Sequence, residues 1–437
     1  MLGLLLATSG CWPSGAQRAA RLAGFGQEAT TGTPPGMAAL DGREWHLALF
    51  HVHTREGGYE FKDPTGLDQA ANYDGPHARY ALRVAATYGI RAVFLTDHNS
   101  ILSAFDKDLQ SSARSVGVTL IPGTEWSLGG PLAINLPITP GHAGPHVAVV
   151  GYRAASARDV LAPRDTRIKA TTNDLNALVD EAHARGGAAI LCHPDALNAD
   201  YPLPPADFDL VEVDGPLIEN PAAARARWQE WLMAGRRIGA ISSANWRVAQ
   251  LPGSPMHHLN LVRAPSRAPD VLTDALRGGH LMVVTSPNKL PRVLLGADAD
   301  GDGSFDDVRE GDVLIPGPGV TRVRFQVRVL GARGRALVLY GAGSREPMHR
   351  ETLEGDEEVR AYSVALQPDR RTFVRAELWQ DTRMLVLTNP LYFDPPPRAA
   401  PDGGATGTAP DGTTNGGDLI RIITVDAGPV PLEGETP

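Results

Sequence analysis

Cysteine is nearly absent from this chain. Only Cys11 and Cys192 occur in 437 residues, so a disulfide framework is excluded. The chain also has no long block of lysine or arginine, and its formal net charge of -9 argues against nucleic acid as a partner. No apolar run is long enough to span a bilayer as a helix. Hydrophobic residues make up 42% of the chain, which is enough for a sizeable core.

The first residues resemble the end of a bacterial lipoprotein signal. A short run, Leu4–Gly10, ends at Cys11, and small residues stand before the cysteine as processing requires. No basic residue precedes this very short run, and a true start codon farther upstream would account for both features. Residues 12–43 are rich in Gly, Ala, Pro and Thr and are typical of a tether. We expect a protein of the bacterial cell envelope, or a secreted one, with a lipid on Cys11 as its only membrane attachment; the alternative is a short unstructured N-terminus.

Short apolar strands alternate with amphipathic helices from Trp45 to about Pro287. The pattern predicts strands at 45–49, 91–96, 118–122, 146–151, 188–192, 210–213, 237–242 and 281–285, and helices at 76–88, 173–185, 222–234 and 269–277. Such alternation indicates a parallel α/β architecture, and seven or eight units suggest a closed barrel.

The texture of the sequence changes around Pro291. Five β segments follow at 320–330, 335–340, 359–366, 372–379 and 384–387, with Gly- and Pro-rich turns between them. They predict a small all-β, sandwich-like domain. The expected organisation is therefore a signal-like segment and tether (1–43), an α/β barrel (44–290), a β domain (291–394) and a low-complexity tail (395–437), in which 419–425 is an optional extra strand.

Metal-ligand residues recur at the ends of the predicted strands. His51 and His53 lie two apart on a strand, so they project to one face as a pincer for a divalent ion. Further such residues stand at later strand boundaries: Asp97, His98, Glu125, His146 and His193. The C-terminal strand ends of a parallel barrel converge on one mouth, so these residues are expected to meet there. Imidazole suits Zn, Mn or Fe, and a carboxylate can bridge two ions.

The order of these motifs resembles that of a known family. The motifs are His51-x-His53, Thr96-Asp97-His98, Pro122-Gly123-x-Glu125, His146 ahead of an apolar strand, and Cys192-His193-Pro194. They resemble the PHP (polymerase and histidinol phosphatase) superfamily, especially its bacterial metallohydrolase branch that includes carbaryl-hydrolase-like proteins. The resemblance covers about residues 44–290 and implies a distorted (β/α)7 PHP-type barrel with metals at its mouth.

The resemblance also implies a ligand set. It places His51, His53 and Glu125 on one metal and Glu125, His146 and His193 on a second, with His98 on a third. Asp97 is either a ligand or a residue that orients one.

The chain departs from the family pattern late in the barrel. The family usually has Asp-x-His after a late strand, whereas this chain has Ser243-x-Asn245. Ser243, Asn245 and nearby Arg247 are expected beside the metals rather than on them, and Arg247 favours an anionic substrate. Gly57 and Gly58 also stand where an acid or histidine is usual. The expectation is at most two tightly bound divalent transition metals, Zn, Mn or Fe.

A separate acidic motif follows the predicted barrel. Asp298, Asp300 and Asp302, followed by Gly303, have the spacing of a Ca²⁺ loop. Arg309 stands where an EF-hand has its bidentate Glu, and no helices flank the loop, so an EF-hand is excluded. The motif is either a structural calcium site or a solvated acidic turn.

The sequence thus predicts a metal-dependent hydrolase with a small-molecule ester as its partner. A phosphoesterase that uses a metal-activated water is the first hypothesis. A carboxylic or carbamic ester hydrolase is an alternative, because an activated water can attack either centre. A binding protein on a catalytically degenerate, surface-anchored PHP fold is the alternative from another class.

Overall fold

The computed structural model describes residues 44–54, 75–98, 100–127, 146–156, 172–194, 207–216, 218, 220–247, 257–285, 291–297, 308–317 and 319–395. The predictions that concern Cys11, Gly57, Gly58, the Asp298–Asp302 motif and residues 396–437 lie outside these ranges. Within them, no helix has the length and hydrophobicity needed to cross a membrane.

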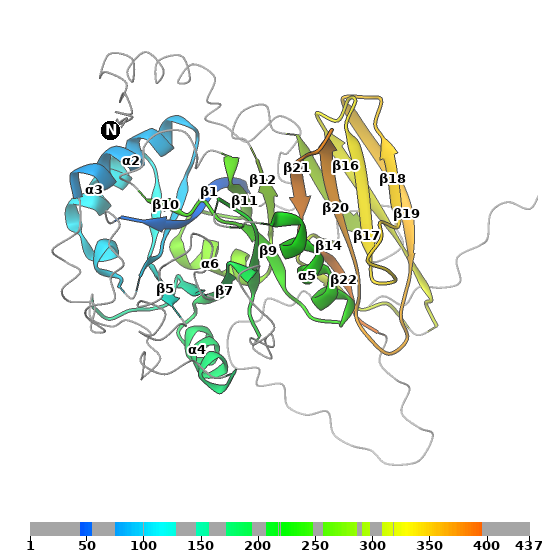
Figure 1. Ribbon diagram of the computed structural model, residues 1–437, viewed down its shortest axis with the longest axis horizontal. Helices are drawn as coiled ribbons and strands as arrows, with labels where there is room; N and C mark the ends of the chain where they lie inside the picture. Colours follow the sequence, from blue (N-terminus) through cyan, green and yellow to red (C-terminus); the bar gives the residue numbers. More distant parts are fainter. Residues whose placement is uncertain are drawn as a thin grey trace, which may run out of the picture.

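The structure is a mixed α/β fold with several sheets and few helices (Figure 1). The helices are α2 (Gly75–Thr87), α3 (Lys107–Ser115), α4 (Thr172–Ala184), α5 (Pro221–Met233) and α6 (Pro269–Arg277). Local sequence sets their starts: the side chain of Asp106 accepts from two backbone amides of α3, and Asn220 caps α5 ahead of Pro221. Helix α3 was not among the predicted helices.

The strands of the first half of the described chain belong to two sheets, and the larger sheet also contains strands from the second half. The largest sheet runs in the order β15 (Val313–Leu314), β22 (Leu391–Phe393), β20 (Thr372–Gln380), β21 (Arg383–Thr388), β12 (Leu281–Val284), β11 (Leu259–Ala264), β1 (Glu44–His53), β2 (Ala92–Leu95) and β4 (Thr119–Ile121). Strand β10 (Trp246–Arg247) also pairs with β1, and β17 (Ala336–Gly341) joins β20 to β18 (His349–Thr352). The second sheet has the order β3 (Asp97–His98), β5 (Gly123–Ser127), β6 (His146–Val150), β7 (Ala188–Cys192), β8 (Leu210–Asp214) and β9 (Gly239–Ser242).

The two sheets share one interior. A single hydrophobic cluster takes alternate residues from both of them, including Phe50, Phe94, Ile190, Leu210 and Val262. The intervening residues pack outward on other clusters, against the helices. Helix α6 adds three side chains to the shared interior: Leu272, Ala275 and Leu276.

Side-chain hydrogen bonds connect β9 to the large sheet, where the two have no backbone pairing among the described residues. The amide of Asn260, on β11, donates to the carbonyl of Ser242 and accepts from its N–H, at 2.8 and 2.9 Å. The amide of Asn389, just after β21, contacts both backbone groups of Ala240 and donates to the carbonyl of Leu281. Two asparagine side chains therefore satisfy backbone groups that a strand ladder would otherwise pair.

The predicted closed barrel of parallel strands is obtained only in part. No backbone ladder joins β9 to β11 or β12 among the described residues, so a (β/α)7 barrel is not shown. Strand β6 runs antiparallel to both β5 and β7, and β11 runs antiparallel to β1, which corrects the expectation of a parallel sheet. The alternation of strands and helices does not fix direction, because a connecting segment can return the chain at either end of a sheet.

The described residues after Pro291 are β strands and turns. A third sheet has the order β14 (Val308–Arg309), β13 (Arg292–Ala297), β16 (Arg322–Leu330) and β19 (Glu357–Ala365). Its inward residues, such as Phe325 and Val327, share a hydrophobic cluster with Val374 and Leu378 of β20. The two layers face each other at the right of Figure 1. Because β12 pairs with β21, the largest sheet contains neighbouring strands from both sides of residue 290 in the sequence.

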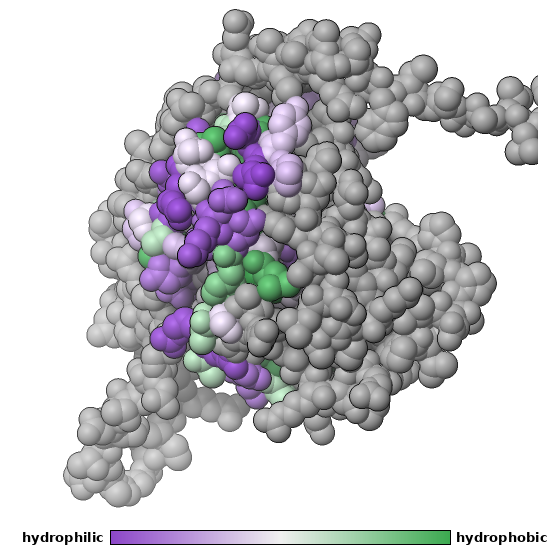
Figure 2. Space-filling view, turned by 90° about the vertical axis from the view of Figure 1, so that its left-hand side faces the viewer, coloured by the Kyte–Doolittle hydropathy of each residue, from purple (hydrophilic) through white to green (hydrophobic). Residues whose placement is uncertain are grey.

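The opposite face of the molecule carries α2 and α3. Its coloured residues are mostly hydrophilic, with a small hydrophobic area among them (Figure 2). Tyr80 and Phe105 are the large hydrophobic residues most exposed in this part of the described chain.

Candidate metal centre

Six residues named from the sequence come together: the carboxylate of Glu125 and five histidines around it. Glu125, on β5, is buried with 1% of its surface exposed. One of its oxygens, Oε1, lies 2.6 Å from His146 Nδ1 and 3.5 Å from His193 Nε2. The other, Oε2, lies 2.9 Å from His51 Nε2, 3.2 Å from His98 Nδ1 and 3.4 Å from His53 Nε2. Five imidazoles from the strands or strand ends therefore surround Glu125.

The direction of β6 explains how His146 joins the others. His146 opens its strand, whereas His53 ends one and His193 follows one. In the antiparallel pairing of β6 with β7, His146 lies opposite Cys192, so the start of β6 meets the end of β7. The antiparallel strand thus corrects the parallel expectation and at the same time accounts for the position of His146.

A β-bulge turns His51 into the site. The pairing of β1 with β2 shifts between Leu49 and Val52, where β1 has one extra residue. His51 occupies the bulge with a φ of 65°, in the left-handed region that residues other than glycine rarely adopt. Leu49 and Val52 pack outward and Phe50 packs inward. The bulge therefore brings Phe50 and His51 to the same side, and from His51 to His53 the expected alternation holds, with Val52 outward between them.

His193 is turned in a similar way. Cys192 points into the shared interior, so regular alternation would send the next residue outward. A φ of 50° at His193 instead returns its imidazole to the cluster. Non-glycine residues in this region of φ are concentrated at functional sites, where surrounding contacts hold the strain.

Pro122 and Gly123 place Glu125 where the chain is tightly packed. A Cβ atom at Gly123 would lie 2.7 Å from the carbonyl oxygen of Leu95 and 2.8 Å from that of Val149. Glycine is therefore required for the chain to pass between β2 and β6 two residues ahead of Glu125.

Glu212 is a member of the cluster that the sequence did not reveal. It lies in the middle of β8, fully buried. Its Oε1 accepts from His51 Nδ1 at 2.6 Å, and its Oε2 accepts from the backbone N–H of His193 at 3.0 Å and lies 3.2 Å from His193 Nδ1. His51 Nδ1 donates to Glu212, and the Nε2 atoms of both histidines face Glu125. A carboxylate behind a histidine is the usual support of a metal ligand.

The buried charges explain the protonation of this cluster. Burial opposes charge on Glu125, but the imidazoles of His51, His98 and His146 outweigh it and hold its pKa well below the usual value. The same balance lowers the pKa of Glu212, through His51 and His193. Burial lowers the pKa of His51, but the negative charges of Glu125 and Glu212 raise it by more than burial lowers it. The pKa of His51 therefore lies well above its usual value. Both carboxylates are therefore charged, and the surrounding imidazoles stabilise that charge.

The donor set fits divalent transition metals. The Nε2 of His51 and Oε2 of Glu125 are buried atoms that form no hydrogen bond among the described residues. Glu125 belongs to two groups of three residues whose ligand atoms all lie within 4.8 Å of one another. One group contains His51 and His193, and the other contains His53 and His98. Imidazole nitrogens around a shared carboxylate suit Zn, Mn or Fe. Here His98 reaches the same carboxylate oxygen as His51 and His53, whereas the resemblance places it on a separate third metal.

The side chain of Asp97 orients the end of β1, and its hydrogen bonds go to Thr54 and Ser103. Its Oδ1 accepts from the backbone N–H of Thr54 at 2.8 Å, and its Oδ2 accepts from Thr54 Oγ1 and Ser103 Oγ. Thr54 directly follows His53, so Asp97 positions that histidine.

The late positions lie beside β1. Arg247 is paired with His53 in the backbone register of β10 and β1. Ser243 is buried, and its Oγ forms no hydrogen bond among the described residues. Asn245 is buried, with a φ of 36°. Cys192 is fully buried on the inner side, where burial and then Glu212 raise the pKa of its thiol.

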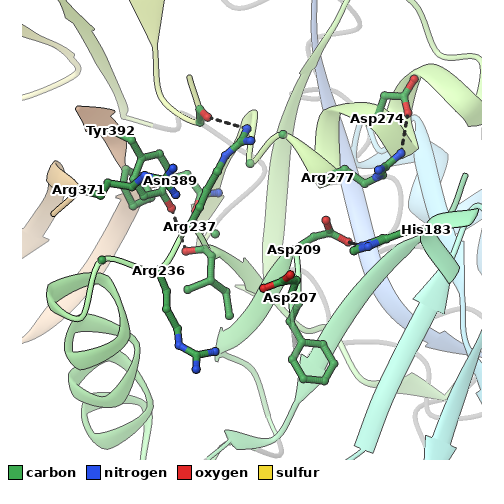
Figure 3. Close-up of a pocket in the computed structure, with 18 residues that line it drawn as sticks. His183, Asp207, Asp209, Arg236, Arg237, Asp274, Arg277, Arg371, Asn389 and Tyr392 are labelled. Carbon is green, nitrogen blue, oxygen red and sulfur yellow. Dashed lines mark hydrogen bonds and ion pairs between the residues drawn. The ribbon is translucent and has the colours of Figure 1, made fainter. Parts of the chain in front are cut away.

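A cavity of about 550 Å³ lies at the other end of the strands (Figure 3). Residues that precede β8 and β9, such as Asp209 and Arg237, line it, whereas Glu212 and Ser242 lie farther along these strands. Arg237 donates to the carbonyl of Gly311, and His183 pairs with Asp209. These contacts connect the segment ahead of β9 to the turn between β14 and β15, and the end of α4 to the segment ahead of β8.

Comparison with known proteins adds little. No family model and no curated protein matches the chain. A candidate metal-dependent phosphoesterase from Bifidobacterium adolescentis matches 48% of this chain and 89% of its own, at 12% identity and a TM-score of 0.27. The CARDB domain of a Pyrococcus furiosus protein, solved in complex with di-metal ions, matches 24% and 94%, at 12% identity and a TM-score of 0.17. Similarities this small show neither the family nor the function of this chain.

Proposed function

We propose that this protein is a metal-dependent hydrolase, with a phosphoester as its substrate. The observation that carries the proposal is Glu125, a buried, charged carboxylate surrounded by five imidazoles, of which His51 and His193 are backed by Glu212. We further propose that the two inner sheets correspond to a distorted barrel of the PHP type. The sequence motifs and the shared hydrophobic interior support this assignment.

Each residue of the cluster has a defined task in this proposal. The two oxygens of Glu125 face different histidines, so one carboxylate would bridge two ions. Glu212 accepts from His51 Nδ1, which would keep Nε2 of that ring available as the ligand atom, and its other oxygen holds the backbone N–H of His193. The bound ions would supply an activated water and polarise the phosphoryl oxygen. Burial of His51, His193 and both carboxylates keeps bulk water from the ligands.

The test combines metal analysis with hydrolysis of model esters. Protein purified without chelator should hold up to two equivalents of Zn, Mn or Fe and hydrolyse p-nitrophenyl phosphate or bis(p-nitrophenyl) phosphate. Glu125→Gln should lose tight metal binding and activity, because a neutral amide cannot bridge two cations. His183→Gln is the matched control, because His183 pairs with Asp209 away from the cluster and should leave both properties unchanged.

The other outcomes separate the alternatives. Faster turnover of p-nitrophenyl acetate than of either phosphate would favour the carboxylic or carbamic ester hydrolase. A chain with neither bound metal nor turnover would favour the binding protein, and three tightly bound metals would contradict the proposed ligand set. Attachment through a lipid on Cys11 is a separate proposal, and mass spectrometry of the mature N-terminus in bacterial cells would test it.

A further inference from the structure

A second polar cluster lies beside the metal-ligand candidates. Asp214 ends β8, two residues beyond Glu212. Leu210 belongs to the shared interior, while Val211 and Val213 pack outward in the cluster that contains Trp228 of α5. Glu212 therefore points inward. The register of β8 with β9 shifts between Glu212 and Asp214, so the contacts of Asp214, and not strand alternation, fix where its side chain lies.

Asp214 holds a serine and a histidine. Its Oδ2 accepts from Ser242 Oγ at 2.8 Å and from His258 Nδ1 at 2.8 Å. A carboxylate only accepts, so both neighbours donate. The Ser242 hydroxyl is directed at Asp214 and not at the imidazole, so this is not a Ser-His-Asp nucleophile. The bond fixes Nδ1–H on His258 and leaves Nε2 to exchange a proton.

His258 lies at the same end of the sheet as the metal-ligand candidates. Strand β11 runs antiparallel to β1, with Ala48 opposite Asn260. The ladder ends at Ala48 and Asn260, and beyond it the carbonyl of Phe50 accepts from the N–H of Ala244. The antiparallel direction of β11 nevertheless places His258, just ahead of that strand, at the end of the sheet where β1 ends. Ser242 binds Asn260 through both backbone groups, so the end of β9 is fixed at this place as well.

His258 also differs from the ligand candidates in exposure. Its side chain is 22% exposed, whereas the side chains of His51 and His193 are 0% and 3% exposed. An oriented, partly exposed imidazole at the end of the sheet that carries the ligand candidates has the properties required of a general acid.

We propose that His258 is a catalytic residue that protonates the leaving oxygen of the ester, with Asp214 as its positioning residue; this rests on the proposed phosphoesterase function. As the P–O bond breaks, the leaving oxygen keeps the bonding electron pair and takes the proton from Nε2 of His258. Water contributes its oxygen to phosphorus and releases a proton, and a proton from solvent restores His258. The neutral imidazole retains its Nδ1–H bond to Asp214.

The test compares two leaving groups in His258→Asn. Phenolate leaves poorly and needs a proton, whereas p-nitrophenolate leaves well without one. Hydrolysis of phenyl phosphate should therefore fall about 10²–10⁴-fold. Hydrolysis of p-nitrophenyl phosphate should fall by less than about tenfold, and metal content should stay unchanged. His257→Asn is the matched control, because His257 lies one residue away and contacts the carbonyl of Thr285 instead of Asp214. It should hydrolyse both esters at the wild-type rate.

Different results would contradict the role of His258 and the proposed hydrolase function. An equal loss on both esters, or no loss on either, overturns the role of His258 while the wild-type turnover leaves the hydrolase intact. Loss of metal from His258→Asn also overturns it, because the residue would then support the metal site. If the wild-type chain with bound metal hydrolyses neither ester, the proposed function fails and the role of His258 fails with it. Asp214→Asn should show the same leaving-group dependence in weaker form.

Discussion

Glu212 shows how much a single buried carboxylate can control. Its Oε1 accepts from the ring Nδ1 of His51 and its Oε2 from the backbone N–H of His193, and both residues have a left-handed backbone. Replacing it with Gln keeps the shape but removes the charge that orients the His51 ring and holds the His193 backbone. We expect Glu212→Gln to remain folded and to bind metal about 10–100-fold more weakly.

Metal titration against a chelating dye measures this effect. Glu310→Gln is the matched control: Glu310 is also fully buried, burial raises its pKa, and its partner is Arg263. An amide should therefore replace it without affecting metal affinity. Equal affinity in Glu212→Gln and the wild type would show that Glu212 does not support the ligands.

The residues that the sequence revealed and those it missed differ in their local signal. His51, His53 and His193 stand at strand ends in motifs that can be read locally. Glu212 lies between two valines on β8, and its partner His51 is 161 positions away, so no local pattern connects them. An acid at an inward position of an otherwise apolar strand was the available signal. His258 was missed because its partner, Asp214, is defined only once β8, β9 and β11 are placed.

At the scale of elements, helices α2, α4, α5 and α6 lie within one residue of their predicted bounds. A glycine follows the end of each helix, and apolar periodicity further defines α2, α4 and α6. Strand directions and the bulge in β1 were not predicted, since both depend on pairing with distant strands. Strand β11 was missed, although it is fully buried, and it carries Asn260 to the gap beside β9.

The junction of β12 with the turn between β14 and β15 depends on Asp312. This side chain accepts from His280 Nε2 at 2.9 Å and from the backbone N–H of Arg309 at 2.8 Å. Burial opposes its charge, but His280, Arg263 and the Arg309 amide outweigh burial and lower its pKa to about 2. A carboxyl with a lowered pKa stabilises the fold above its unfolded pKa of about 4, and the contribution is lost as the pH falls toward 2.

We therefore expect Asp312→Asn to lower the free energy of unfolding by about 2 kcal/mol at pH 7. Urea unfolding of the variant and the wild type at pH 7 and at pH 2–3 measures the difference, which should shrink at the lower pH. Asp356→Asn is the control, because Asp356 pairs with Arg333 in solvent. A difference that does not change with pH would assign the effect of Asp312→Asn to packing rather than charge.

At the scale of the whole molecule, the change in sequence texture near residue 290 does not coincide with a gap in the structure. The pairing of β12 with β21 continues one sheet across it. The amide of Asn389 reaches from the end of β21 to Ala240 and Leu281. Arg375, on β20, donates to Gln229 on α5. The α/β part and the β layers therefore share backbone pairing, a buried amide and a buried guanidinium.

These shared contacts predict that the two parts unfold together. Calorimetry of the full chain should show one transition, with equal calorimetric and van't Hoff enthalpies. Asn389→Ala should shift that whole transition to lower temperature, because it leaves buried backbone groups of Ala240 and Leu281 without partners, at about 1–3 kcal/mol. Arg345→Ala is the control, because its ion pair with Glu230 is exposed. Two separated transitions, only one of which moves in Asn389→Ala, would show that the β layers form an independent unit despite the continuous sheet.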